Sequence, residues 1–599
     1  MTPQAHWITA NHGSRYPRRF TYVQALTEIT PTEHGAIETW VGAVCAHRGA
    51  THKTASKRGL AWQAFDQTDD LWRWIAERTE NRSRTVVVAH GVSTLLRVSN
   101  ALPAMIALGW VVAGIRLDDG STYVQWRKGE RTLIVVDLVA WIAEPMATIV
   151  DLLDGYDRAD RLPPPWETGA RRRAAENVSV IATAWETLLQ WCEAEDLGNW
   201  HPTGAGQAWA AWRHRFMPTR VLCHDLADVR AHERASVYCG RTEAFRHGHL
   251  PGARWVELDF ARAYVAICRD AWLPSKYMWT TDRVNLDRVM AAPPTYRYLL
   301  DVTVTTDRPS VPWRDGRGIC WPVGEFRSWL WHDEARLVLA DGGTLKVHRA
   351  HVYRGAQVLA EWARWVDQVL DGHVPSAGPL ERRAVKHWGR ALVGRFGAQW
   401  SDWDPWGEPL DCHVGVTRVV DVSTGERYRL LAAGGPLLAE GPKSDGADTA
   451  PSLMSAVMSA TRVKMDGALR SVARPGDVAH CDTDGLIVAP RAALRVMRAN
   501  PGLRIKAEWL DLTVLGPRQL HGDRGVHIAG LARGASAPVD GRSVGVVRQG
   551  MAAALASGDH GHVVVTRRVW SIRGVDNRRR HLPNGLTAPV TVNGGRRVG

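Results

Sequence analysis

The chain has 599 residues, 45% of them hydrophobic, and a formal net charge of +13. This length offers material for about four domains and a large buried core. The positive charge is typical either of a protein with a polyanionic partner, most commonly nucleic acid, or of a soluble protein with a basic surface. Eight scattered cysteines without a CxxC pair exclude a disulfide framework and a structural zinc site.

No segment of the chain predicts a membrane partner. The N-terminus lacks the apolar core of a signal peptide. The longest apolar run, Ala101 to Ile115, is shorter than a bilayer span and contains Pro103 and Gly109. We therefore expect this run to be buried and the protein to be cytoplasmic. Tryptophan is abundant, at 29 residues, and could stack on single-stranded bases, although most tryptophans of a globular protein pack in or near its core.

Taken in chain order, the hydrophobic pattern predicts an α+β protein. A proline-rich connector at 160–175 precedes a helix over 177–197. Strands are predicted over 254–260 and 299–305, and helices over 361–370, 381–396 and 453–465. From about residue 535 onward the sequence is rich in glycine and arginine and predicts short strands. The pattern of this region does not indicate a function.

Three segments carry residues suited to phosphoryl transfer. In the first, an alternating strand ends at Asp259 and turns into a helix that bears Tyr264. The second places Arg382 and Lys386 four residues apart, on one face of a helix. In the third, apolar strands flank the sequence Asp482-Thr-Asp-Gly485, which suits a hairpin turn.

Two-metal phosphoryl transfer needs carboxylates that converge on two divalent ions, and fixed cations for the triphosphate. Asp259 and Asp484 could supply the carboxylates, and Arg382 with Lys386 the cations. Each segment by itself also has an ordinary structural interpretation. An Asp-Thr-Asp turn suits a solvated hairpin tip, and an Arg–Lys pair suits a solvated helix face.

The order and the amino-acid sequences of these segments resemble motifs A, B and C of family B DNA polymerases. Motif A reads D-x-x-S-L-Y, and Asp259 and Tyr264 keep its two ends. Motif C reads Y-x-D-T-D, and the chain keeps D-T-D with His480 in place of the tyrosine. Motif B of the protein-primed branch reads K-x-x-x-N-S-L-Y-G-K-F. The chain keeps four of its residues and departs at the Asn, Ser and Tyr positions: Lys386, Leu392, Gly394 and Phe396 are kept, and Arg390, Ala391 and Val393 depart.

Further segments extend the resemblance over about residues 20–533. Tyr238 to Phe245 is similar to the Y-x-G-G/R element that links nuclease and polymerase domains, which implies that Tyr238, Gly240 and Arg241 contact DNA. Pro322 to Trp331 resembles the insertion of protein-primed members. The K-x-Y primer contact is expected near Arg518, with Leu520 in place of its tyrosine.

The resemblance implies a right-hand polymerase with palm, fingers and thumb, preceded by an RNase H-like exonuclease-type domain. The expected divisions follow that order: an exonuclease-like domain over 1–235, a first palm part with the insertion over 236–370, fingers over 371–400, a second palm part over 401–533, and a thumb or C-terminal region over 534–599.

The resemblance also implies roles for the site residues. Asp259, Asp484 and the backbone carbonyl of Phe260 would hold two Mg²⁺ ions, with Mn²⁺ as the alternative metal, and Asp482 would be a supporting carboxylate. Tyr264 would lie under the sugar of the incoming nucleotide and reject a 2′ hydroxyl, or else be a core tyrosine. The deoxynucleoside triphosphate would be bound by Arg382, Lys386 and Arg390. The expected partners are template and primer DNA, and a priming protein if synthesis starts from one.

The nuclease-like region departs from the chemistry of the family. The closest match to its D-x-E motif is Gln24-Ala-Leu26, and the N-x-x-F-D motif has Gly91 and Leu95 at its two ends. The Y-x-x-x-D motif has neither its tyrosine nor its aspartate in Arg173 to Asn177. Glu28 or Glu176 could be a displaced ligand. We expect a domain without nuclease activity that guides the template strand as a basic wall.

The expected function is template-directed DNA synthesis without proofreading. Its role would be replication of a mobile element, damage tolerance or defence against phage. A catalytically silent scaffold that binds nucleic acid is one alternative, and the survival of Asp259 and Asp484 argues against it. A template-independent nucleotidyltransferase is another alternative, and the sequence does not distinguish it from a template-directed polymerase. The priming mode also stays open.

Overall fold

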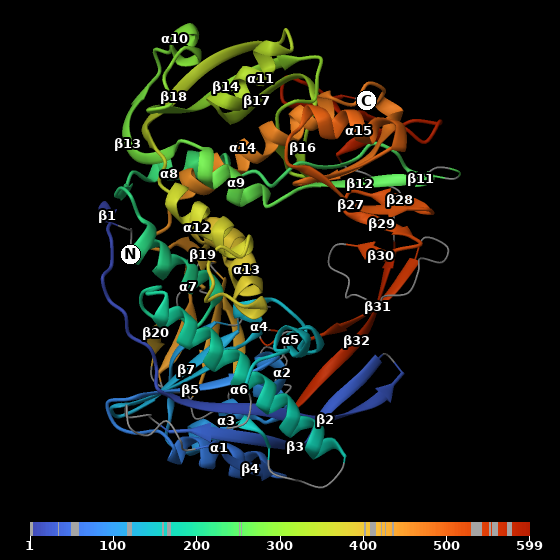
Figure 1. The fold of residues 1–599 in the computed structure, drawn as a ribbon. Helices are drawn as coiled ribbons and strands as arrows, with labels where there is room; N and C mark the ends of the chain where they lie inside the picture. The colour runs from blue at the N-terminus through green and yellow to red at the C-terminus, as the bar shows by residue number, and fades with distance from the viewer. Residues whose placement is uncertain are drawn as a thin grey trace.

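A computed structural model describes most of the chain, and Figure 1 shows its arrangement. The described residues are 4–33, 35–49, 59–116, 122–157, 161–163, 169–250, 252, 254–400, 403–407, 415–420, 422–423, 425, 427–433, 436–441, 443–528, 542–549, 551, 553, 561–571 and 578–598. Seven cysteines among them are free thiols, and Cys412 lies outside the described residues.

The N-terminal domain is built on a mixed sheet with β2 (Arg19–Thr32) at its centre. β3 (Gly35–Arg48) pairs antiparallel with β2 and also with β4 (Ala61–Phe65). On the other side, β5 (Arg84–Ala89) and β8 (Arg131–Asp137) follow in parallel. The resulting order β4-β3-β2-β5-β8 is that of an RNase H-like sheet, as the resemblance implied.

Alternating residues of these strands fill two cores on opposite faces of the sheet. Tyr22 and Val88 face the core that includes α6 (Ala170–Ala194), whereas Val23 and Val87 face the core that includes α1 (Thr68–Glu77). Helix α6 begins before its predicted start because the exposed arginines 171–173 form its first turn, and arginine is a good helix former.

The palm is a five-stranded antiparallel sheet in the order β10-β25-β26-β12-β27. Its strands come from distant segments: β10 (Thr242–Ala244), β12 (Trp255–Phe260), β25 (Val478–Asp482), β26 (Gly485–Val488) and β27 (Leu503–Trp509). Leu258 and Val488 pack with residues of α14 (Pro451–Arg470) and α15 (Pro490–Ala499) in one core. The predicted strand at 254–260 and the hairpin at Asp484 are confirmed.

The segment expected to form the fingers, 371–400, is essentially helix α13 (Pro379–Phe396), which packs with α12 (Ala360–Leu370) in one core; both helices lie close to their predicted bounds. Trp388 of α13 is fully buried and donates its Nε1 hydrogen to the carbonyl of Trp141, at 3.0 Å. Gly389 lies against α9 (Ala263–Asp270), where a Cβ would be only 3.1 Å from Val265 Cγ2. Helix α13 is therefore held between the N-terminal domain and the palm.

A six-stranded sheet lies beside the palm, in the order β13-β18-β14-β17-β35-β36. Its strands are β13 (Leu273–Thr281), β14 (Tyr296–Thr306), β17 (Val323–Trp331), β18 (Thr344–Ala356), β35 (Thr591–Asn593) and β36 (Arg596–Val598). The predicted strand at 299–305 lies within β14, and the insertion-like segment of the sequence is essentially β17. The chain therefore returns near its C-terminus to a sheet formed by its middle third.

Two further units contact the N-terminal domain. Within 403–440, strands β20 (Trp403–Gly407), β21 (Gly415–Val420), β22 (Arg427–Ala432) and β23 (Leu437–Glu440) form a separate sheet, and Val416 and Leu431 pack into a core of that domain. The palm strands of the segment 401–533 begin only at β25. A hairpin of β31 (Arg542–Arg548) and β32 (His562–Ser571) pairs with β3 and links the upper and lower parts of the molecule (Figure 1).

The apolar run at 101–115 forms α3 (Ala101–Ala107) and most of β6 (Val111–Arg116) in the N-terminal domain. Ala101, Leu102 and Met105 are buried in one of its cores, as expected from the sequence. In the described part of the chain, no helix is long and apolar enough to cross a membrane.

Candidate active site

Asp259 and Asp484 meet at one end of the palm sheet. Asp259 lies on β12 opposite Gly485 of β26, and Asp484 belongs to the two-residue loop between β25 and β26. The Phe260 amide donates to the carbonyl of Asp484 at 2.8 Å. A Cβ at residue 485 would be 3.0 Å from Asp259 Oδ1, so the glycine lets this carboxylate lie directly against β26.

The two carboxylates repel each other. Burial, followed by the charge of Asp259, raises the pKa of Asp484 to about 6. Burial also raises the pKa of Asp259, and the neighbouring cation Lys506 only partly opposes this. Among the described residues, Asp484 has no cation within salt-bridge distance, and the nearest cation to Asp259 is Lys506, at 4.0 Å. Both ionised forms would therefore be stabilised by an additional cation.

The donor set fits a hard divalent ion. Carboxylate and carbonyl oxygens suit Mg²⁺ or Mn²⁺, and Mg²⁺ is usually held by one or two carboxylates together with water and substrate phosphates. The described residues contain no cluster of three or more His, Cys, Asp or Glu side chains that could hold a metal by itself. Asp259 and Asp484 thus match a site that substrate completes, rather than a closed structural metal site.

The segment 238–241 supports the loop that carries Asp484. Thr483 has a left-handed backbone, with φ 59°, and its amide donates to the carbonyl of Arg241 at 2.7 Å. A Cβ at Gly240 would be 2.6 Å from Thr483 Cγ2. Glycine at 240 is therefore required for the close approach of the two segments.

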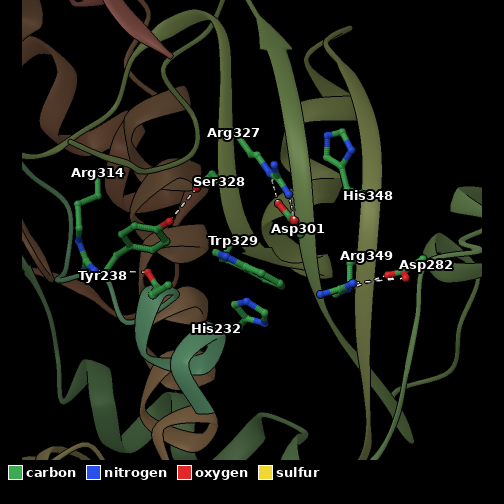
Figure 2. Close-up of a pocket in the computed structure, with 11 residues that line it drawn as sticks. His232, Tyr238, Asp282, Asp301, Arg314, Arg327, Ser328, Trp329, His348 and Arg349 are labelled. Carbon is green, nitrogen blue, oxygen red and sulfur yellow. Dashed lines mark hydrogen bonds and ion pairs between the residues drawn. The ribbon is translucent and has the colours of Figure 1, made fainter. Parts of the chain in front are cut away.

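The side chains of Tyr238 and Arg241 are buried, and the structure corrects the expectation that they reach DNA. Tyr238 shares a hydrogen bond of 2.9 Å with the hydroxyl of Ser328, as Figure 2 shows. Arg241 is 3% exposed and forms ion pairs with Glu243 and Asp466. Since these partners occupy both side chains, the segment supports the Thr483–Asp484 loop, and any contact with DNA would have to come from its backbone.

Asp482 is engaged by protein groups, unlike Asp484. It accepts hydrogen bonds from the hydroxyls of Thr242 and Thr483, each at 3.1 Å. Arg518 Nε lies 3.1 Å from the other carboxylate oxygen, and the Arg518 amide donates to His480 Nε2 at 3.0 Å. The exposed Arg518 therefore lies beside the carboxylates, where the primer contact was expected.

Tyr264 lies in the first turn of α9 and is only partly buried. Burial, and after it the charge of Asp484, raises its pKa to about 12. The ring packs against the core that α13 and the N-terminal domain share. Tyr264 therefore lies near the carboxylates with part of its surface open, as a residue under a bound sugar would.

Helix α13 presents a cationic face. Arg382, Lys386 and Arg390 recur every four residues and are exposed, whereas Val385, Trp388 and Leu392 are buried. Lys386 is close enough to Asp259 to oppose the rise in its pKa. Among the described residues, neither Lys386 nor Arg390 forms a salt bridge, while Arg382 donates to the carbonyl of Ala377. The terminal N–H groups of Arg382 have no hydrogen-bond partner among the described residues, so all three predicted cations can bind an anion.

The structure adds Glu257 and Lys506, which sequence reasoning missed. Lys506 Nζ lies 2.8 Å from Glu257 Oε1. Partial burial lowers the pKa of Lys506, but this hydrogen bond and the charges of the neighbouring carboxylates together outweigh it and raise that pKa. Period-2 alternation on β12 places Glu257 on the same face as Asp259, which was a usable signal. Lys506 was not predictable, because a β-bulge in the long-range pairing of β12 with β27 places it there.

The described part of the nuclease-like domain holds no matching carboxylates. Gln24 and Leu26 lie on β2, Gly91 is the left-handed N-cap of α2 (Val92–Val98), and Leu95 is buried. The candidates for displaced ligands are both exposed, and Glu176 pairs with Arg172 on the outer face of α6. One carboxylate, Glu186, does face β2 from α6, but it is already neutralised: it accepts from Tyr22 at 2.7 Å and from Arg48 and Arg161 at 2.5 and 3.0 Å.

A pair of carboxylates where palm and fingers meet, behind an RNase H-like sheet, is the architecture of a right-hand polymerase. Solved structures bear out this class. Phi29 DNA polymerase complexed with primer-template DNA matches with a TM-score of 0.64 and 11% sequence identity, over 93% of this chain and 100% of that one. Its ternary complex with incoming nucleotides matches with a TM-score of 0.63 over the same shares. No family model and no curated protein match the chain. At this identity the likeness shows the fold, which is that of Phi29 DNA polymerase.

Proposed function

We propose that the protein is a template-directed DNA polymerase that adds deoxynucleotides to a 3′ hydroxyl. The observation that carries this proposal is the convergence of Asp259 and Asp484 at the palm edge, within reach of the charge of Lys386. Paired carboxylates with raised pKa values are expensive to maintain unless they bind a cation. The fold shared with Phi29 DNA polymerase supports the same conclusion.

Asp259, Asp484 and the backbone carbonyl of Phe260 would hold two Mg²⁺ ions, or Mn²⁺. Such ions lower the pKa of an attacking hydroxyl and neutralise charge on the reacting phosphate. The protein's own residues orient the reactants. Lys386 and Arg390 on the exposed face of α13 bind the triphosphate and favour departure of pyrophosphate, together with the terminal N–H groups of Arg382.

Tyr264 packs under the sugar and excludes a 2′ hydroxyl, and Arg518 binds the primer strand next to Asp482. We also propose that the N-terminal domain has no nuclease activity and guides the template, since Gln24, Leu26, Gly91 and Leu95 stand where the nuclease motifs have their metal-binding residues. Action in the cytoplasm is part of the proposal, as is a role in replication of a mobile element, damage tolerance or defence against phage. The start of synthesis from a priming protein is proposed from the sequence resemblance alone.

The test is incorporation of labelled deoxynucleotides on defined templates, with and without a primer, by the wild type and by Asp259→Asn and Asp484→Asn. These isosteric changes remove one charge each, so we expect activity to fall about a thousand-fold or more while the fold is retained. Robust synthesis by either variant would refute the assignment. DNA binding without incorporation by the wild type would favour a silent scaffold, and products independent of the template sequence would favour a template-independent transferase.

A further inference from the structure

Exposed aromatic side chains gather around two adjoining cavities outside the palm sheet. Trp7, Trp279 and Tyr296 are 41%, 44% and 37% exposed. They come from β1 (His6–Ile8), β13 and β14, and Figure 1 shows β1 and β13 on the left edge of the molecule, across from β12. Since aromatic rings of this size are usually buried, three exposed rings in one region indicate a surface that binds something.

Cations lie between these rings. A cavity of about 850 Å³ is lined by Trp7 and Tyr296 together with Arg220, Lys276 and Arg354. Tyr296 also lines a second cavity of about 480 Å³, which contains Trp279 and two further arginines, Arg283 and Arg288. Of the described residues that line the two cavities, none is an aspartate or a glutamate. We call Trp7, Trp279, Tyr296, Arg220, Lys276 and Arg354 the aromatic–basic strip.

The register of the sheet places two cations of the strip opposite each other, which does not stabilise the fold. Arg354 on β18 lies directly opposite Lys276 on β13 and opposite Tyr296 on β14. Like charges opposite each other in an antiparallel pair destabilise a sheet. Among the described residues, none of the three cations of the strip forms a salt bridge, and Lys276 lies over the Trp7 ring with Nζ 5.9 Å from its centroid. These charges are therefore left for an external anion.

The cavity of Figure 2 provides a contrast on the same sheet. Two of its three arginines are already neutralised: Arg327 pairs with Asp301, and Arg349 with Asp282 at 2.7 Å. The stacked ring of Trp329 is covered by His232, with ring centroids 4.3 Å apart. Carboxylates neutralise two arginines there, whereas no carboxylate among the described residues pairs with the cations of the aromatic–basic strip.

We propose that the aromatic–basic strip binds single-stranded nucleic acid outside the polymerase site. Bases would stack on Trp7, Trp279 and Tyr296, and phosphates would pair with Arg220, Lys276 and Arg354. Aromatic rings interleaved with cations are how proteins hold single strands without sequence preference. An acidic peptide would use the cations but leave the rings exposed, and a duplex keeps its bases stacked and away from them. The strip thus gives the protein a second contact with an unpaired strand.

The test measures binding of the full-length protein to a fluorescein-labelled deoxythymidine oligomer of about 15 nucleotides, a length typical of such sites. The triple variant Arg220→Ala/Lys276→Ala/Arg354→Ala should bind at least about tenfold more weakly and lower the slope of log affinity against log salt by about 2. Trp7→Ala/Tyr296→Ala should also bind at least about tenfold more weakly. The matched control Arg418→Ala/Arg474→Ala/Arg498→Ala removes three exposed arginines elsewhere and should retain wild-type affinity and slope.

Two further measurements locate the bound strand and identify its chemistry. An iododeoxyuridine oligomer should crosslink to Trp7, Trp279 or Tyr296, and an abasic oligomer should bind weakly and equally to the wild type and Trp7→Ala/Tyr296→Ala. Equal oligomer affinity in all variants, equal loss in the control, or abasic binding as tight as the deoxythymidine oligomer would overturn the proposal. Extension of a short primed template should be unchanged in the strip variants, so failure here is distinguishable from failure of the proposed polymerase function.

Discussion

Single residues shape the site through their size as well as their charge. Gly240 and Gly485 lie where a Cβ would be 2.6 Å from Thr483 Cγ2 and 3.0 Å from Asp259 Oδ1, respectively. The first distance is shorter than normal packing allows and the second is tighter than most contacts, so a side chain at either position would displace Thr483 or Asp259. The position of the loop that carries Asp484 thus depends on the missing side chains of Gly240 and Gly485.

Gly240→Ala tests this requirement. The added methyl group would push the Thr483–Asp484 loop away from residues 238–241, and overpacking of this kind costs about 1–3 kcal/mol. We expect a lower thermal midpoint and slower primer extension. Gly316→Ala is the control, because a Cβ added at Gly316 would meet no described atom within 4 Å. Wild-type rate and stability in Gly240→Ala would show that the loop does not depend on this contact.

Tyr264→Ala tests the proposed sugar contact. Removing the ring opens the space under the sugar, so ribonucleotides should be incorporated more readily relative to deoxynucleotides, by about tenfold or more. The measurement compares incorporation of both nucleotide types by the wild type and the variant. Tyr264→Phe keeps the ring and should keep the discrimination. If Tyr264→Ala discriminates as well as the wild type, the residue is a core tyrosine and the 2′ hydroxyl is sensed elsewhere.

At the scale of elements, α13 combines two functions on opposite faces. Its buried face joins the N-terminal domain through Trp388, while its exposed face carries Arg390 and Lys386, whose charge reaches Asp259 of the palm. Because the helical period sets both faces, the position of the cations depends on the packing of the buried residues.

Lys386→Ala and Arg390→Ala should each weaken use of the incoming nucleotide. A hydrogen bond between charged groups contributes about 1.5–3 kcal/mol, so kcat/KM should fall about ten- to a hundred-fold, with kcat affected as well as KM. Single-nucleotide extension at limiting substrate measures both. Arg383→Ala is the control, since Arg383 lies on the same helix but pairs with Glu144. Unchanged kinetics in both variants would place the triphosphate elsewhere.

At the scale of the whole molecule, segments far apart in sequence close the structure. β32 pairs with β3 of the N-terminal domain, and β35 pairs with β17 beside the palm. The C-terminal part of the chain therefore contacts both the N-terminal domain and the sheet beside the palm. The described residues of the N-terminal sheet contain no acidic cluster for nuclease chemistry.

The proposed absence of proofreading concerns the whole molecule and can be measured directly. A labelled primer-template with a 3′ mismatch, incubated with enzyme and Mg²⁺ but no nucleotides, should keep its length. Addition of nucleotides should extend the mismatched end without prior shortening. Asp259→Asn is the control for contaminating nuclease. Progressive shortening of the primer by the wild type and by Asp259→Asn alike, in preparations free of other nucleases, would contradict the expectation.

Acid should destabilise the fold through buried histidines. Burial lowers the pKa values of His47, His201 and His351 to about 4. The unfolded chain therefore binds more protons than the folded one between about pH 6.5 and pH 4, so stability present above that window is lost as pH falls through it. We expect each histidine to remove about 2 kcal/mol at about pH 5. Denaturant midpoints at about pH 7.5 and pH 5 measure this, and an equal or higher midpoint in acid would refute it.

Local patterns were sufficient for much of the fold and for the central site residues. Helical and strand periodicity predicted α12, α13, α14 and β12, because each buries a face whose spacing is visible in a short window. Asp259, Asp484 and Lys386 were predicted from the order of the motifs. A motif gives the neighbours of a residue in the sequence but not the residues that surround it in space. For the same reason the sequence predicted a DNA contact for Arg241 and could not show that Glu243 and Asp466 enclose its side chain.

The sequence by itself therefore determined the elements, the carboxylate pair and the cationic face of α13. Only the tertiary structure decided which groups are free. It pairs β12 with β27 and so brings Lys506 to Glu257, it covers Arg241, and it aligns Lys276 with Arg354. The physical reason is that periodicity is a property of neighbouring residues, whereas burial and charge pairing depend on strand partners more than 70 residues apart in the chain, whose register no local pattern contains.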